Sequence, residues 1–235
     1  MVALLEIERF AVAYGPAPVV RDVSFSLSSG EIMALLGRNG MGKTTLLRGL
    51  LGLAPVRKGS ALFAGTQIAE LATETIARAG VAYVPAGREI FGSLSVRENL
   101  IMSARAGNDG PGWTLERVLK LFPRLAERID HGGRQLSGGE QQMLAIGRAL
   151  MTNQRLLLID EATEGLAPLV ARDIWRTLAE ICASGMSAII VDRDLKRLSR
   201  IVGNVAVLFR GEIVFAGTPG ELLADGDLVR KYIGL

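Results

Sequence analysis

The stretch Gly37-Arg38-Asn39-Gly40-Met41-Gly42-Lys43-Thr44 decides the fold of this chain. It matches the phosphate-binding loop pattern G-x-x-x-x-G-K-[ST], also called Walker A, at every fixed position. The short apolar run at 31–36 reads as a buried strand, and residues 44–51 have the apolar content of a packed helix. Glycines let backbone N–H groups close around an anion, and a helix N-terminus adds favourable partial charge. The sequence therefore predicts a phosphate-binding loop between a strand and a helix.

Side chains of this loop have separate predicted tasks. Lys43 can reach the terminal phosphates of a nucleotide, and the Thr44 hydroxyl can ligate Mg²⁺. A glycine-rich turn that contains Lys-Thr by coincidence is the alternative, and the flanking strand and helix disfavour it. The residues expected to bind the nucleotide here are Gly37, Arg38, Asn39, Gly40, Met41, Gly42, Lys43, Thr44 and Thr45.

A second chemical element is the apolar run Leu156-Leu157-Leu158-Ile159 that ends in Asp160-Glu161. Ligands bind at the carboxyl ends of strands in open α/β sheets, which is where these two acids would lie. Asp160 can supply an oxygen ligand to Mg²⁺, directly or through water. Glu161 can orient and deprotonate the water that attacks a γ-phosphate. Alone, the pattern also fits a strand that meets solvent, but its pairing with the phosphate-binding loop favours ATP hydrolysis.

Composition restricts the class of protein. The 235 residues are 49% hydrophobic and 22% charged, with a formal net charge of +3, which is typical of a globular chain with a sizeable core. Basic residues are scattered among acidic ones, so no nucleic-acid partner is expected. Cys182 is the single cysteine, which suits a reducing cytoplasm. The N-terminus lacks a signal peptide pattern, and no apolar run approaches about 18 residues, so any membrane association must come through a partner.

The pattern along the chain predicts an α/β core with a helical insertion. Strands are expected near 6–14, 24–27, 80–85, 155–160 and 186–192, and a hairpin at 205–215. Between about 93 and 150 the pattern is helical, with helices that begin after Ser95 and Thr114. We therefore expect one domain over 1–235, with a core at about 1–86 and 152–235 and a helical subdomain at about 87–151.

A third element, Leu136-Ser137-Gly138-Gly139-Glu140-Gln141, is a polar glycine turn that opens a helix with Ser137 as its N-cap. It closely resembles the signature of ATP-binding cassette (ABC) ATPases and stands where that family has it, shortly before the Asp-Glu strand. The resemblance implies the ABC cassette form of the P-loop NTPase fold, with a RecA-like core, an N-terminal antiparallel β-subdomain and an inserted helical subdomain. It also implies ATP and Mg²⁺ as ligands and a second ABC ATPase subunit as partner, in a homodimer or a heterodimer.

In that family two cassettes meet head to tail, so signature residues would contact ATP held by the partner's phosphate-binding loop. The residues that the resemblance assigns to this contact are Ser137, Gly138, Gly139 and Glu140. Tyr14 falls where the family usually has an aromatic residue that stacks on adenine; a core tyrosine is the alternative.

Other stretches resemble one branch of the family. The segments 82–91, 94–100, 140–150 and 164–168 are similar to the smaller ATPase of branched-chain amino-acid importers and of related amide and urea systems. This resemblance implies separate transmembrane permease subunits and a peripheral location on the cytoplasmic face of the membrane. The permeases would be received near residues 86–99. Two alternatives stay open: a soluble ABC ATPase without a transport role, and a regulatory ABC-like subunit that binds ATP without hydrolysing it.

Three positions depart from the general ABC pattern. Ala86 stands where most cassettes carry a glutamine, and Ala167 stands where an aspartate is usual. Arg193 replaces the histidine that contacts the γ-phosphate; arginine cannot act as an acid or base but can clamp phosphate oxygens. We therefore expect Arg193 to act in catalysis with Lys43 and Glu161. The alternative is that Arg193 points to solvent or pairs with Asp192 or Asp194.

Overall fold

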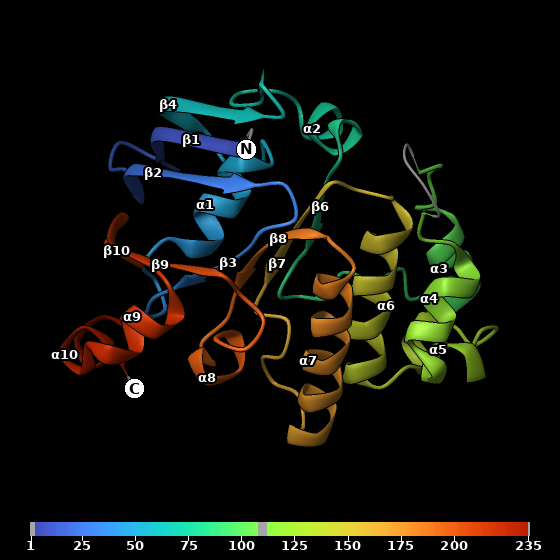
Figure 1. The fold of residues 1–235 in the computed structure, drawn as a ribbon. Coiled ribbons are helices and arrows are strands. Elements are labelled where there is room, and N and C mark those ends of the chain that lie inside the picture. Colours follow the sequence, from blue (N-terminus) through green and yellow to red (C-terminus); the bar gives the residue numbers. More distant parts are fainter. Residues whose placement is uncertain (1–2, 108–111, 235) are drawn as a thin grey trace.

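A computed structural model describes residues 3–107 and 112–234 of the chain, which form a six-stranded sheet and a smaller antiparallel sheet with helices packed around them (Figure 1). The six-stranded sheet has the order β10-β9-β3-β8-β7-β6. In that order its strands are Glu212–Gly217, Asn204–Phe209, Ile32–Leu36, Ser187–Val191, Leu156–Asp160 and Val81–Val84. Only β9 and β10 are antiparallel neighbours, as expected for the predicted hairpin, and the other neighbours are parallel. The predicted α/β class is confirmed.

The second sheet is antiparallel and is built mainly from the N-terminal part of the chain. Its order is β2-β1-β4-β5, formed by Val20–Ser28, Ala3–Val12, Val56–Phe63 and Thr66–Gln67. In Figure 1 this sheet lies over α1, on the opposite side of that helix from the six-stranded sheet. The predicted N-terminal β-subdomain is therefore present, although β4 and β5 were not among the expected strands.

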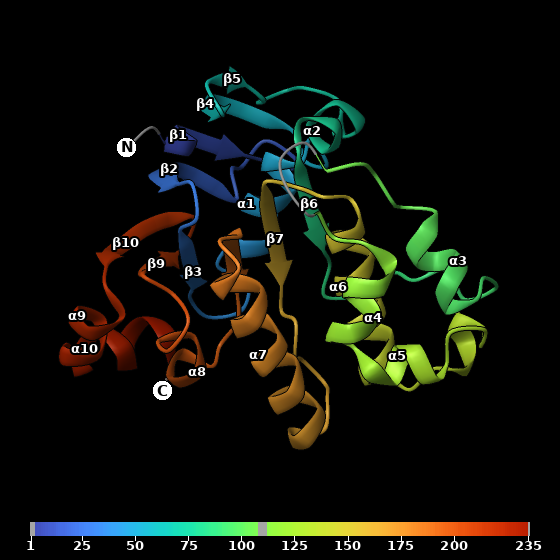
Figure 2. The ribbon, with the colours of Figure 1, turned by 45° about the vertical axis from the view of Figure 1, so that its right-hand side comes forward.

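The helices fall between and after these strands. They are α1 Lys43–Leu50, α2 Thr73–Ala79, α3 Val96–Ile101, α4 Leu115–Leu121, α5 Pro123–Glu127, α6 Gly138–Met151, α7 Pro168–Ala183, α8 Leu195–Leu198, α9 Pro219–Ala224 and α10 Gly226–Leu228. In Figure 1, α3, α4 and α5 lie beyond α6 at one side of the molecule, and Figure 2 shows the same three helices grouped with α6. All three fall in the interval assigned to the helical subdomain. Across residues 3–107 and 112–234, none of these helices has the length and apolar character needed to cross a bilayer.

The six-stranded sheet lies between two hydrophobic cores, and successive side chains of a strand point alternately into one core and the other. Met33 and Leu35 of β3 pack into the core that also contains α1 and the antiparallel sheet, whereas Ala34 and Leu36 face the core of α6 and α7. Successive side chains of a strand point to opposite faces of a sheet, so these short apolar strands are buried on both sides. This double burial fixes the strand ends, and with them the loops that follow.

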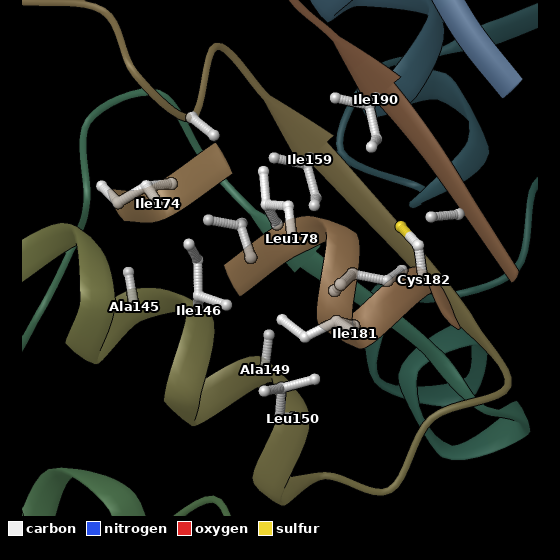
Figure 3. Packing of buried hydrophobic residues seen from close by; sticks show 14 of the residues in the cluster. Ala145, Ile146, Ala149, Leu150, Ile159, Ile174, Leu178, Ile181, Cys182 and Ile190 are labelled. Atoms are coloured by element: carbon white, nitrogen blue, oxygen red, sulfur yellow. The ribbon is translucent and has the colours of Figure 1, made fainter. Parts of the chain in front are cut away.

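Helices α6 and α7 cover one face of the sheet and pack closely against each other. Figure 3 shows Ile146 and Leu150 of α6 turned toward Leu178 and Ile181 of α7. The approach is tight at the start of α6, because a Cβ atom added at Gly139 would lie 2.2 Å from Cγ1 of Val170. Gly139 thus has a packing role within this chain.

Candidate functional site

The predicted chemical elements meet at one edge of the six-stranded sheet. The phosphate-binding loop follows β3, Asp160 ends β7, and Arg193 follows β8. These three strands are neighbours and parallel, in the order β3-β8-β7. Carboxyl ends of parallel strands lie at the same edge, so segments more than a hundred residues apart in sequence converge there.

The phosphate-binding loop depends on two of its glycines. Gly37 has φ of +137°, and a Cβ atom there would lie 2.3 Å from the backbone oxygen of Leu208. Gly42 has φ of +105° and occupies the N-cap position of α1. Both backbone conformations are accessible to glycine and strained for other residues. The loop therefore keeps its shape through sterics, before any ligand is considered.

The ammonium group of Lys43 is curled back into this loop. Its Nζ atom donates hydrogen bonds to the backbone oxygens of Gly37 at 2.8 Å and Arg38 at 3.0 Å. The side chain is buried, and burial lowers the pKa of Lys43, although Glu161 and Asp160 nearby act in the opposite sense. Among the residues that the structure describes, no carboxylate lies at hydrogen-bond distance from this buried ammonium, so an anion in the loop would compete well with the two neutral carbonyls.

A cavity of about 360 Å³ lies in front of the loop. Its lining joins two of the predicted elements and consists of Val19, Asn39, Gly40, Gly42, Lys43, Thr44, Thr45 and Glu161. Neither Tyr14 nor Ser137 is in that lining within the described part of the chain. The structure thus brings Glu161 to the phosphate-binding loop and leaves the signature segment outside the cavity.

Asp160 has the chemistry of a ligand for a hard cation. Its side chain is 1% exposed, and its Oδ2 atom accepts a hydrogen bond from the Tyr83 hydroxyl at 3.2 Å. Its Oδ1 atom is buried and has no hydrogen-bond partner among the residues that the structure describes. Mg²⁺ commonly takes one or two protein oxygens and completes its shell with water and phosphate oxygens. The Asp160 carboxylate and the Thr44 hydroxyl fit this donor set.

Glu161 combines an unusual backbone with a shifted acidity. It has φ of +49°, a conformation that non-glycine residues adopt rarely and that recurs at functional sites. Hydrogen bonding to the Glu164 carboxyl, together with burial and the charges on Glu164 and Asp160, raises the pKa of Glu161 to about 7. A carboxylate that titrates near neutral pH suits transfer of a proton from water.

Arg193 pairs most closely with Glu164 and more loosely with Glu161. Its Nη2 atom is 3.0 Å from Oε1 of Glu164 and 3.9 Å from Oε1 of Glu161. The predicted alternative, pairing of this side chain with Asp192 or Asp194, is wrong in this structure. The buried Asp192 carboxylate accepts backbone N–H groups of Arg193 and Asp194 at 2.7 and 3.0 Å.

Asp192 also fixes the neighbouring loop. Its Oδ2 atom accepts a hydrogen bond from the Thr163 hydroxyl at 3.2 Å. One carboxylate therefore holds both the loop after β8 and the loop after β7. The acid was visible in the sequence, but only the fold shows that a residue 29 positions away completes the contact.

The signature segment forms a capping box at the start of α6. Ser137 is the N-cap, as predicted, and its Oγ atom accepts the backbone N–H of Glu140. The Glu140 carboxylate accepts the backbone N–H of Ser137 at 2.8 Å and pairs with Arg128 at 3.0 Å. In this chain the Glu140 side chain is thus engaged in holding the turn.

Tyr14 is 56% exposed, so the alternative of a core tyrosine is wrong. The phenols of Tyr14 and Tyr83 raise the pKa of the nearby Arg48 guanidinium of α1. An exposed aromatic ring beside the helix of the phosphate-binding loop is compatible with stacking on a base.

Comparison with known proteins agrees with this geometry. The chain matches the ABC transporter family over residues 20–164. It is 37% identical to the high-affinity branched-chain amino acid transport ATP-binding protein BraG of Pseudomonas aeruginosa, over 98% of this chain and 100% of BraG. It is 33% identical to the lipopolysaccharide export system ATP-binding protein LptB of Escherichia coli, over 99% and 98% of the two chains. A crystal structure of the ADP conformation of an ATP-binding cassette of an ABC transporter superposes with a TM-score of 0.83 and 25% identity, over 98% of each chain.

Proposed function

Because the chain belongs to the ABC transporter family and is an ATP-hydrolysing, ATP-binding subunit of a transporter, we propose that it drives import of branched-chain amino acids or similar small solutes. The observation that carries the choice of solute is the 37% identity to BraG along the whole chain. The 33% identity to LptB favours lipopolysaccharide export as the second candidate. For either candidate, we propose that the protein binds separate permease subunits at the cytoplasmic face of a membrane.

The proposed hydrolysis uses the groups at the sheet edge. The backbone of the phosphate-binding loop and Lys43 hold the ATP phosphates, with Lys43 exchanging its two carbonyl partners for phosphate oxygens. Glu161 accepts a proton from the attacking water. The Arg193 guanidinium stabilises the charge that spreads over the transferred phosphoryl group. Thr44 and Asp160 would hold Mg²⁺, which would neutralise charge on the phosphates.

We propose that the complete site needs two subunits. Ser137 and Gly139 lie outside the cavity of their own chain, which supports their use by the neighbouring subunit. Activity per chain should then rise with protein concentration. Mixing Lys43→Ala with Ser137→Arg chains should restore one intact site per heterodimer. Flat activity on dilution, with no rescue on mixing, would contradict the shared site.

We propose that the permease docks on a groove between the core and the helical insertion. The groove, of about 280 Å³, is lined by residues that include Leu53, Arg88 and Arg148. Phe91 and Met102 are close in sequence to the groove residues Glu89 and Ser103, and their side chains are 44% and 53% exposed. Apolar exposure next to basic side chains suits an amphipathic segment of a partner.

Reconstitution tests the function directly. The chain would be assembled in liposomes with candidate permease subunits, and uptake of radiolabelled leucine would be measured with internal ATP. Uptake should occur with the wild type and be lost with Glu161→Gln, which is the matched control. Activity that responds to lipopolysaccharide, without leucine uptake, would favour the export candidate.

A further inference from the structure

Tyr83 connects strand β6 to the acid at the end of β7. The two strands are parallel neighbours, with Tyr83 in register with Leu158, two residues before Asp160. The Tyr83 hydroxyl reaches across to Oδ2 of Asp160 at 3.2 Å. The carboxylate is almost completely buried and the phenol is partly buried, so water competes little for this contact.

The hydrogen bond runs from the phenol to the carboxylate. The Tyr83 hydroxyl is the donor and Oδ2 of Asp160 is the acceptor. An ionised carboxylate has no proton to donate, so the phenol O–H supplies the only proton in this contact.

This contact makes the two carboxylate oxygens of Asp160 unequal. Oδ2 has the phenol as its donor, whereas Oδ1 is buried without a hydrogen-bond partner in residues 3–107 and 112–234. A carboxylate without the phenol could rotate and exchange its oxygens. We propose that Tyr83 is a positioning residue for the divalent cation: its hydroxyl holds Asp160 so that Oδ1 is the oxygen presented to the metal. This inference rests on the proposed metal role of Asp160.

The Tyr83 hydroxyl should affect binding of the metal but not binding of the nucleotide itself. Tyr83 does not line the cavity at the phosphate-binding loop, so its hydroxyl should act on the nucleotide only through the metal. Partners that orient a metal ligand typically change metal affinity about 10- to 100-fold when removed. Tyr83→Phe deletes only the hydroxyl and keeps the ring in the sheet.

The test uses Mn²⁺ as a paramagnetic substitute for Mg²⁺. Mn²⁺ affinity would be measured by electron paramagnetic resonance in the complex with a slowly hydrolysed ATP analogue, and analogue affinity would be measured separately in EDTA. Tyr83→Phe should weaken Mn²⁺ binding about tenfold or more and leave analogue affinity in EDTA unchanged. Tyr232→Phe, whose ring packs edge-on against Phe209, is the matched control and should change neither.

Two results would overturn the proposal. Unchanged Mn²⁺ affinity in Tyr83→Phe would show that the hydroxyl does not orient Asp160. An equal loss of ATP-analogue affinity in EDTA would show that the hydroxyl has only a structural role. Asp160→Ala tests separately whether Asp160 binds the metal. Full Mn²⁺ affinity in that variant would show that Asp160 is not a ligand.

Discussion

Gly139→Ala tests whether the signature glycine is needed for packing as well as for ATP. The added Cβ would lie 2.2 Å from Cγ1 of Val170, well inside van der Waals contact, so α6 and α7 must move apart or Val170 must leave its rotamer. Overpacking of this kind costs about 1–3 kcal/mol, and the better helix propensity of alanine returns up to about 1 kcal/mol. We expect a net loss of about 1–2 kcal/mol, which for a chain of this size lowers Tm by about 2–8 °C.

Thermal unfolding of the nucleotide-free protein, followed by circular dichroism, measures this loss without any contribution from ATP. Gly138→Ala is the matched control, because its Cβ would meet only the flexible end of Arg88, at 2.7 Å. Val170→Ala should make room, so the double variant with Gly139→Ala should be more stable than the two single losses predict. The packing argument fails if Gly139→Ala is as stable as Gly138→Ala, or if Val170→Ala gives no relief.

Further predictions concern the chemistry of the site. Lys43→Ala should abolish tight binding of a slowly hydrolysed ATP analogue, whereas Glu161→Gln should retain it and lose turnover; normal turnover of Glu161→Gln would refute its role as base. Arg193→Ala should lower kcat strongly with little change in ATP affinity, and an unchanged kcat would leave Arg193 in its exposed ion pair, worth at most about 1 kcal/mol. Carboxyl NMR titration of the nucleotide-free protein should give Glu161 a pKa of about 7. Glu164→Gln removes both the carboxyl hydrogen bond and the negative charge that raise this pKa, so the titration should move to lower pH; no movement would refute the assigned cause.

Much of the fold could be predicted where the signal was local. The strand before Gly37, the strand that ends at Asp160 and the N-caps at Ser95, Thr114 and Ser137 all depend on residues close in sequence, and the structure has each of them. Helix α7 also had a local signal, with proline at its first position and apolar residues at helical spacing, but it was not among the expected elements.

What the sequence did not reveal depends on contacts between distant segments. Strand β4 carries a charged, glycine-containing first half and becomes a strand by pairing with β1. Tyr83 and Asp160 are 77 residues apart and meet only because β6 and β7 are neighbours. Pairing of Arg193 with Asp192, one of the alternatives to its catalytic role, does not occur, because backbone N–H groups, which have no sequence signature, occupy one oxygen of the Asp192 carboxylate.

The two hydrogen-bonded loops at Asp192 suggest a route by which two ATP sites could be coupled. One buried carboxylate binds both the backbone at Arg193 and the Thr163 hydroxyl, so the two loops are tied to each other. The Thr163 loop leads directly into α7, where Val170 packs against Gly139 of the signature. If two subunits share each ATP as proposed, loss of a γ-phosphate beside Arg193 would be felt at the signature that faces the other ATP. Alternation between the sites would need no relay beyond this stretch of packed chain.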